Sequence, residues 1–171
     1  STVAMVAHIV SMSVFCVAGA FQFSPALRAR RRWHRTAGRV LLPLGFVAAV
    51  SGAWLAVFFG GPDEEFPLAM VRLFFCAVML VFLTMSAIAI VRRDFTAHGS
   101  WSTRAFAIAV SGGTQALVSI LWTIPFGEPD ASGETWVVGA GFVLNCLVAE
   151  IIIRRRVAAT SRAAERGALV S

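Results

Sequence analysis

The sequence predicts an all-α integral membrane protein, a bundle of about five transmembrane helices with its N-terminus outside and its C-terminus in the cytoplasm. Of 171 residues, 58% are hydrophobic and only 14% are charged, and the mean hydropathy is +0.78. A soluble domain carries about 25% charged residues. This chain therefore has too few charged residues to form the polar surface of a soluble domain. An exterior that faces lipid does not need such a surface.

The apolar residues gather in runs that are long enough to cross a bilayer. A hydrocarbon core of about 30 Å needs a helix of about 20 apolar residues. Runs of this kind occupy residues 2–20, 37–59, 66–91, 105–126 and 135–153. Each run is continuous, whereas a membrane barrel would show short alternating segments. We therefore predict helical spans over these ranges.

The connectors between the runs alternate in charge, and this alternation predicts the orientation. Residues 21–36, residues 92–104 and the tail are rich in arginine, while residues 60–65 and 127–134 are acidic. Short basic loops stay in the cytoplasm. With five spans, every basic connector falls on one side of the membrane. We expect a transmembrane bundle over residues 1–153 and a basic cytoplasmic tail over residues 154–171.

The net charge of +6 comes entirely from arginine, because the chain has no lysine. Arginines placed at the ends of spans suit anionic lipid headgroups, so we expect membrane lipids as partners and no nucleic acid. Each of the three cysteines lies inside an apolar run without a second ligand at metal-binding spacing. Buried free thiols are the expected state.

A first candidate site lies at the predicted cytoplasmic surface, before the second and fourth spans. It would use the side chains of His34, Arg39, Asp94, His98, Trp101 and Arg104 to bind an anion, a lipid headgroup or a cofactor. In a helix, Asp94 would face His98 four residues later and could accept a hydrogen bond from it. The alternative is a charged loop whose arginines only hold the membrane boundary.

Polar residues within the predicted spans form a second group of candidates: His8, Gln115, Asn145 and Glu150. Such residues are costly in hydrocarbon and usually face the interior of a bundle. We expect His8 to bond a neighbouring helix. We expect Glu150 to pair with Arg154, four residues later, or with another cytoplasmic-side arginine; the alternative is a proton-carrying role.

Two further polar features of the spans invite a structural interpretation. Ser111, Gln115 and Ser119 form a stripe in the fourth span, which is typical of helix packing, and a hydrated path is the alternative. Arg72 is expected to reach toward the acidic residues 63–65.

Familiar enzyme signatures are absent from the sequence. It has no phosphate-binding glycine loop, no nucleophile elbow and no HExxH pair. A catalytic role is therefore the less favoured class, although the sequence leaves it open.

An ordered set of motifs carries a resemblance to a known family. The set comprises His8-Ile9, the stretch from Phe21 to Pro25 with Leu27-Arg28, His34-Arg35 with Gly38-Arg39, Arg93-Asp94-Phe95 with His98, Trp101 and Arg104, and Asn145 with Leu147 to Glu150. It resembles a domain-of-unknown-function family of bacterial multi-spanning predicted membrane proteins. Gly99 and Ala116 depart from the family's pattern, which has basic residues there.

The resemblance implies a topology and no assigned reaction. It implies a multi-pass protein of a bacterial inner membrane, with a further hydrophobic segment upstream, and the chain opens with Ser1 rather than Met.

Three functions fit these observations. The first is a non-catalytic accessory or scaffold subunit of a larger membrane complex, in contact with other subunits and with lipid or pigment. The second is an electron carrier that holds b-type haem through His34 and His98, since axial histidines are required and His8 is predicted in the other half of the membrane. The third is a small transporter that uses Glu150, Asn145 and the polar stripe.

Overall fold

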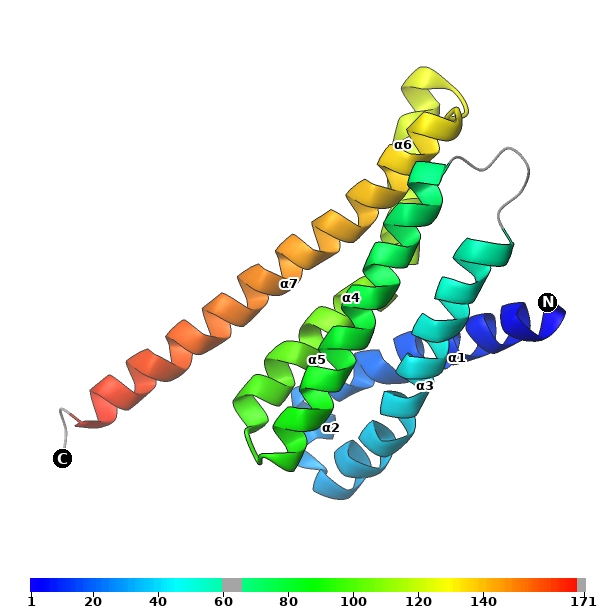
Figure 1. The fold of residues 1–171 in the computed structure, drawn as a ribbon. Helices are drawn as coiled ribbons and strands as arrows, with labels where there is room; N and C mark the ends of the chain where they lie inside the picture. The colour runs from blue at the N-terminus through cyan, green and yellow to red at the C-terminus, as the bar shows by residue number, and fades with distance from the viewer. Residues whose placement is uncertain (60–65, 169–171) are drawn as a thin grey trace.

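The computed structural model describes residues 1–59 and 66–168, and it is built of α-helices (Figure 1). In chain order they are α1 (Thr2–Gln22), α2 (Pro25–Ala29), α3 (Arg31–Phe58), α4 (Phe66–Val91), α5 (Phe95–Ala109), α6 (Ser111–Phe126) and α7 (Ala131–Ala168). No strand occurs in these two ranges. Four helices are long and apolar enough to cross a membrane. The bent pair of α5 and α6 would form a fifth span if the two helices together cross it. The predicted all-α membrane bundle is confirmed.

Several helices extend beyond the apolar runs that predicted them. Helix α3 begins at Arg31, α5 begins at Phe95, and α7 continues to Ala168. The 38 residues of α7 correspond to about 57 Å of helix, which exceeds the hydrocarbon core. Arginine and alanine are good helix formers, so the helix does not end where the apolar run ends. The basic tail therefore begins as a continuation of α7.

Proline separates the first span from the next helix. Helix α1 ends at Gln22, and Ser24 takes an extended conformation with ψ of 123° before Pro25. A residue that precedes proline avoids the helical region, and proline itself fits the first turn of α2. Proline therefore accounts for the break between α1 and α2.

A tight turn joins α4 to α5. The N–H of Asp94 donates to the carbonyl of Ala89, and the N–H of Arg93 donates to Ile90, each at 2.9 Å. Arg93 takes the left-handed φ of 59° that this helix-ending motif requires. Asp94 then caps α5 by accepting from the N–H of Ala97. Arg93 therefore ends α4, and Asp94 caps the start of α5.

The helices pack around a small interior. Helix α4 packs on α3 and on α5, while α1 packs on α3, and α7 packs on α5 and α6. The core is formed by Phe15, Leu41, Ala49, Met79, Leu83, Ala105, Ile108 and Ala109. In the described part of the chain, no Cα of α3 comes within 8 Å of a Cα of α5. The second and fourth spans are therefore not adjacent, and α4 and α1 each pack on both of them.

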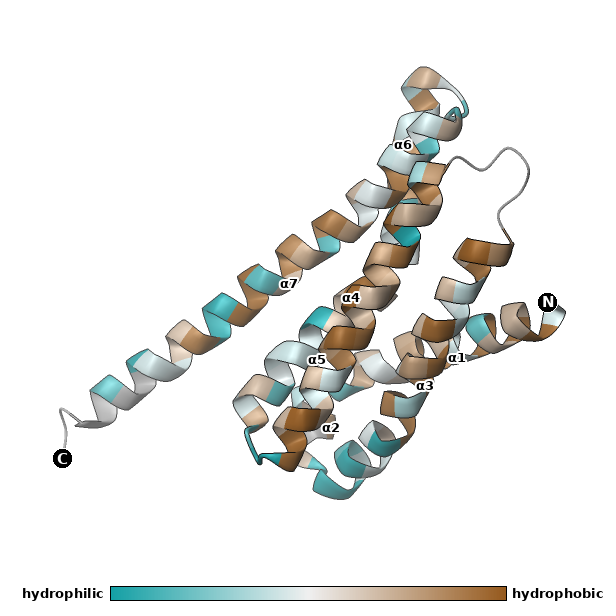
Figure 2. Cartoon of the chain, in the orientation of Figure 1, coloured by the Kyte–Doolittle hydropathy of each residue, from teal (hydrophilic) through white to brown (hydrophobic). Residues whose placement is uncertain are grey.

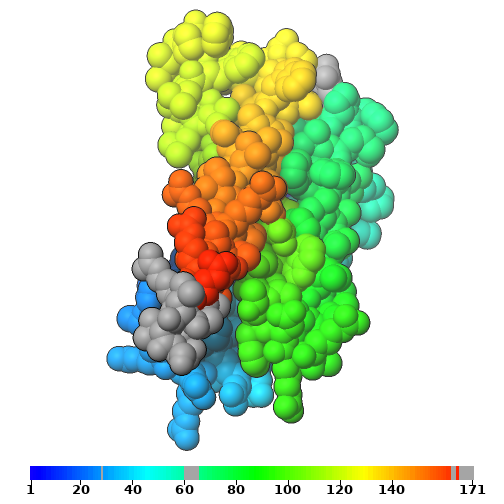
Figure 3. All heavy atoms as spheres, turned by 90° about the vertical axis from the view of Figure 1, so that its left-hand side faces the viewer, coloured from blue at the N-terminus to red at the C-terminus, as the bar shows by residue number. Residues whose placement is uncertain are grey.

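The outer surface of the bundle is apolar. In the four long apolar helices, only 17–28% of the residues in the apolar stretch are buried inside the bundle. Side chains of α6 such as Leu121 and Ile124 are also largely exposed. Figure 2 shows hydrophobic residues along the middle of the helices and hydrophilic ones at the start of α3 and at the α4–α5 turn. Figure 3 shows α7 on the outside of the bundle, beside α4 and α5. A bilayer would cover these surfaces.

The connections lie at alternate ends of the bundle. The α1–α3 connection and the α4–α5 turn lie at one end, and the α6–α7 connection lies at the other (Figure 1). This arrangement is the one that five spans require. Which end faces the cytoplasm stays a prediction.

Candidate functional site

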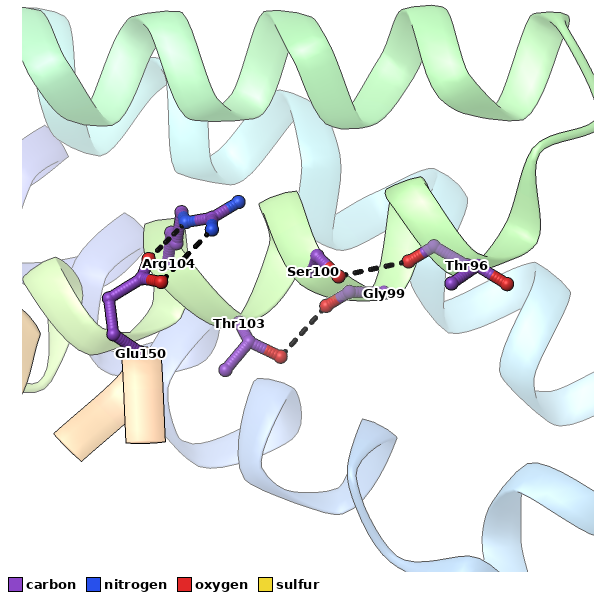
Figure 4. A network of polar contacts seen from close by, with 6 residues as sticks. All are labelled: Thr96, Gly99, Ser100, Thr103, Arg104 and Glu150. Carbon is purple, nitrogen blue, oxygen red and sulfur yellow. Dashed lines mark hydrogen bonds and ion pairs between the residues drawn. The ribbon is translucent and has the colours of Figure 1, made fainter. Parts of the chain in front are cut away.

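An ion pair joins α5 to α7 within the bundle (Figure 4). Nε of Arg104 donates to Oε1 of Glu150 at 2.5 Å, and Nη2 donates to Oε2 at 3.2 Å. The guanidinium also lies 4.7 Å from the ring centre of Trp101. A two-pronged contact of this kind is the strong form of a carboxylate–arginine pair. Glu150 is thus paired with an arginine, as predicted.

The partner of Glu150 is Arg104, and no ion pair joins Glu150 to Arg154 within the described ranges. Of the two kinds of partner that were predicted, the structure shows an arginine of a neighbouring helix and not the one four residues later on the same helix. The side chain of Arg154 is exposed, whereas Arg104 projects from the neighbouring helix and reaches both carboxylate oxygens. Sequence spacing could identify only a partner on the same helix.

His98 contacts α4 rather than Asp94. Its Nδ1 lies 2.9 Å from Oγ of Ser86, and Ser86 in turn lies 2.8 Å from Oγ of Ser102. The carboxylate of Asp94 accepts from the backbone at the start of α5. The suggested bond between Asp94 and His98 is therefore replaced by a helix cap and a serine contact. Ser86 was not among the predicted residues.

His34 and Arg39 lie on α3, whereas the ion pair of Arg104 joins α5 to α7. His34 is half-buried and Arg39 is exposed. In the described ranges no Cα of α3 lies within 8 Å of a Cα of α5, so His34 and His98 lie on helices that are not adjacent. The shared cytoplasmic site, and with it axial ligation of haem by these two histidines, stays a prediction.

His8 bonds the neighbouring helix, as predicted. Its Nδ1 lies 2.9 Å from the carbonyl oxygen of Ala48 and 3.3 Å from Oγ of Ser51, both on α3. Gly52 makes room for the ring, since a Cβ at this position would lie 2.9 Å from Cε1 of His8. No sequence spacing links His8 to Gly52.

Asn145 holds α6 against α7. Its Nδ2 donates to the hydroxyl oxygens of Ser111 at 3.2 Å and Thr114 at 2.9 Å. Both hydroxyls lie just after the 42° bend between α5 and α6. Asn145 therefore fixes the direction in which the fourth span continues, which is the packing role expected for polar residues in spans.

Arg72 forms an ion pair at the other end of the bundle. Its Nη2 lies 3.4 Å from Oε1 of Glu134 at the start of α7. The predicted acidic partners at 63–65 lie outside the described residues. Arg72 therefore bridges α4 and α7 near the α6–α7 connection.

A cavity of about 400 Å³ lies between the helices at the bend. Its lining comes from every long helix and is mainly apolar, with Met12, Met79, Ile108 and Phe142 among it. Three polar side chains also line it: His8, Arg72 and Gln115. The volume lies within the range of about 300–1,000 Å³ that is typical of ligand pockets.

Two of these polar groups have no hydrogen-bond partner among the residues that the structure describes. They are Nε2 of His8 and the side-chain amide of Gln115. Both side chains are half-buried, so a molecule in the cavity can reach these groups. The cavity can therefore offer hydrogen bonds to a small polar group carried on an apolar body. The predicted site residues His8 and Gln115 both line this cavity, whereas the sequence did not identify Gly52, Cys76 and Gly112 as part of a site.

The cysteines add no metal site. Cys16, Cys76 and Cys146 are half-buried and free. Across residues 1–59 and 66–168, no three His, Cys, Asp or Glu side chains are grouped as metal ligands.

The family model of a predicted membrane protein, DUF2306, matches residues 5–153. The chain belongs to this family. The DUF2306 match extends over every candidate span and includes His8, the cavity and the pair of Arg104 and Glu150. It confirms the resemblance that the motifs indicated. No curated protein and no solved structure matches the chain.

Proposed function

We propose that this DUF2306 protein is a non-catalytic membrane protein that binds a small amphipathic molecule in the cavity between its spans. It would serve a larger membrane complex as an accessory subunit that holds lipid or pigment. The observation that carries the proposal is the pairing of an apolar cavity with the unsatisfied polar groups of His8 and Gln115. A hydrogen bond to each of these groups would stabilise the bound molecule by about 0.5–1.5 kcal/mol.

The chemistry of the lining supports a molecule with two parts. Methionine, leucine, isoleucine, valine, phenylalanine and alanine side chains form most of the wall, and they favour an apolar body. Methionine adapts its shape to a ligand. The polar groups of His8 and Gln115 favour one hydrogen-bonding head group on that body.

A matched pair of glycines tests the proposal. Gly112 lines the cavity and Gly113 does not, and a Cβ at either position meets nothing within 4 Å. Gly112→Leu should therefore place an apolar side chain at the cavity with no clash at its Cβ, while Gly113→Leu makes the same chemical change beside it. The wild type and both variants would be purified in a mild detergent, and the bound molecules identified by solvent extraction and mass spectrometry.

We expect the wild type and Gly113→Leu to retain one small amphipathic molecule, and Gly112→Leu to lose most of it. Equal recovery from all three proteins, or recovery of bulk phospholipid alone, would contradict the proposal. An absorbance spectrum of the same samples would separate a pigment from a colourless lipid, and a Soret band would favour the haem alternative.

A small transporter is a second candidate, because the helix bend lies at the cavity. Ala109 and Gly112, on either side of the bend, both line it. Interrupted helices beside a central cavity are typical of transporters. Uptake of the identified molecule into proteoliposomes, lost in Gly112→Leu and kept in Gly113→Leu, would favour transport over simple binding.

A further inference from the structure

The hydrogen bonds of His8 determine which ring nitrogen carries the proton. Nδ1 lies 2.9 Å from the carbonyl oxygen of Ala48, and a carbonyl oxygen can only accept. The second neighbour, Oγ of Ser51, donates its single proton to the carbonyl of Val47 at 2.6 Å. Toward His8 this hydroxyl can therefore only accept. Nδ1 must be the protonated nitrogen, because both of its neighbours are acceptors.

A neutral imidazole with its proton on Nδ1 presents a lone pair at Nε2. This nitrogen has no hydrogen-bond partner in the described ranges, and His8 lines the cavity. Nε2 is thus an acceptor that a ligand's donor can satisfy.

The ring cannot easily turn away from this position. A Cβ added at Gly52 would lie 2.9 Å from Cε1 and 3.3 Å from Nδ1 of His8, so the ring lies directly on the α3 backbone. Gln115 supplies the complementary group from α6, since its amide can donate to an oxygen atom. Acceptor and donor therefore line one cavity from two helices.

Resting on the proposed function, we infer that the bound molecule carries a hydroxyl group, as a lipid-soluble alcohol or phenol. The hydroxyl donates to Nε2 of His8, and its oxygen accepts from the amide of Gln115. A ketone, an ester or an ether on the same apolar body offers no proton to Nε2. Such molecules leave that nitrogen without a hydrogen bond. In an apolar site a missing hydrogen bond discriminates between ligands more strongly than a small difference in ligand size does.

Two probes of nearly equal size test the inference. 4-Hexylphenol carries the hydroxyl, and 4-hexylanisole replaces its hydrogen with a methyl group. Binding of each to the protein in lipid nanodiscs would be measured by calorimetry, with Gly112→Leu as the reference for partition into the lipid. We expect the phenol to bind at least about fivefold more tightly than the anisole, as one hydrogen bond implies.

His8→Asn separates the role in binding from the role in folding. The shorter asparagine amide can still donate to the carbonyl of Ala48, but it has no group at the position of Nε2. We expect this variant to bind both probes equally, at the affinity of the anisole. His8→Gln, whose amide reaches further, should restore part of the preference for the phenol.

Nitrogen NMR tests which ring nitrogen of His8 carries the proton, without a measurement of binding affinity. In ¹⁵N-histidine-labelled protein, the signal absent from His8→Asn should show a protonated Nδ1 and an unprotonated Nε2. The Nε2 signal should move when the phenol is added and stay in place with the anisole. A protonated Nε2 in the free protein would overturn the inference.

The outcomes separate the two proposals. If both probes bind the wild type equally and neither binds Gly112→Leu, the cavity holds a ligand but the hydroxyl assignment is wrong. If neither probe binds the wild type more than Gly112→Leu, the proposed cavity function fails and the inference fails with it. Among hydroxyl-bearing molecules, mass spectrometry of the extracted ligand would distinguish an isoprenoid or quinol from a glyceride.

Discussion

Glu150 illustrates how a charged residue is accommodated inside an apolar bundle. Its carboxylate meets the fork of Arg104, and the guanidinium lies on the ring of Trp101. The side chain of Arg104 is 23% exposed and that of Glu150 is 37% exposed. An arginine on a facing helix satisfies both carboxylate oxygens, which a lone hydroxyl or amide could not do. The pair therefore links α5 to α7 as well as neutralising charge.

We expect Glu150→Gln to lower the free energy of unfolding by about 1–2 kcal/mol, because Arg104 would keep its charge and lose its partner. Thermal unfolding in detergent would measure the change. Arg154→Gln is the matched control, since its exposed side chain should contribute less than about 0.5 kcal/mol.

A double-mutant cycle with Arg104→Gln would confirm which arginine is the partner. Stronger coupling of Glu150 to Arg104 than to Arg154 is the expected result. Stronger coupling to Arg154 would contradict the pairing of Glu150 with Arg104.

At the scale of the helices, the bend between α5 and α6 shapes the cavity. Helix α6 approaches α7 so closely at Gly141 that a Cβ added there would lie 2.5 Å from Cγ of Gln115 and 3.1 Å from its backbone nitrogen. The hydrogen bonds of Asn145 hold the same contact on the next turn. Small residues at a helix crossing and a polar clamp beside it are a common combination in membranes.

Gly141→Ala should therefore destabilise the bundle by about 1–3 kcal/mol, because the backbone of α6 would have to shift. Gly139→Ala on the same helix meets nothing within 4 Å and should be neutral or stabilise α7 by up to about 1 kcal/mol. Melting temperatures of the two variants in the same detergent would measure the contrast. Equal effects would contradict the close packing of α6 on α7.

At the scale of the whole molecule, the connections alternate between two ends (Figure 1). The arginine-rich residues 21–36 and 92–104 lie at the end that holds the α1–α3 connection and the α4–α5 turn, whereas the acidic residues 127–134 lie at the other end. This agreement between charge and topology supports a cytoplasmic tail and an outer α6–α7 connection.

Single cysteines would test that orientation. In a variant with Cys16, Cys76 and Cys146 replaced by alanine, we expect Glu128→Cys to react with an impermeant thiol reagent added outside the cell. Thr160→Cys should react only after the membrane is opened. Both positions are exposed. Labelling of Thr160→Cys from outside would reverse the predicted topology.

The sequence by itself determined the class of the molecule and the position of its spans. Apolar runs and charge alternation depend on local composition, so they predicted α1 and α4 almost to the residue and indicated that His8 and Glu150 would be paired inside the bundle. Helix ends set by backbone hydrogen bonding, such as the start of α5 at Phe95, extended beyond the apolar signal.

Only the tertiary structure decided which distant residues meet. It showed that Arg104, not Arg154, pairs with Glu150, and that His98 contacts Ser86. It also placed His8 beside Gly52 and showed that His8 and Gln115 line the same cavity. These pairings depend on the rotation and crossing of helices that are far apart in the chain. Periodicity identifies residues that share one helix face, but not the face of the helix packed against it.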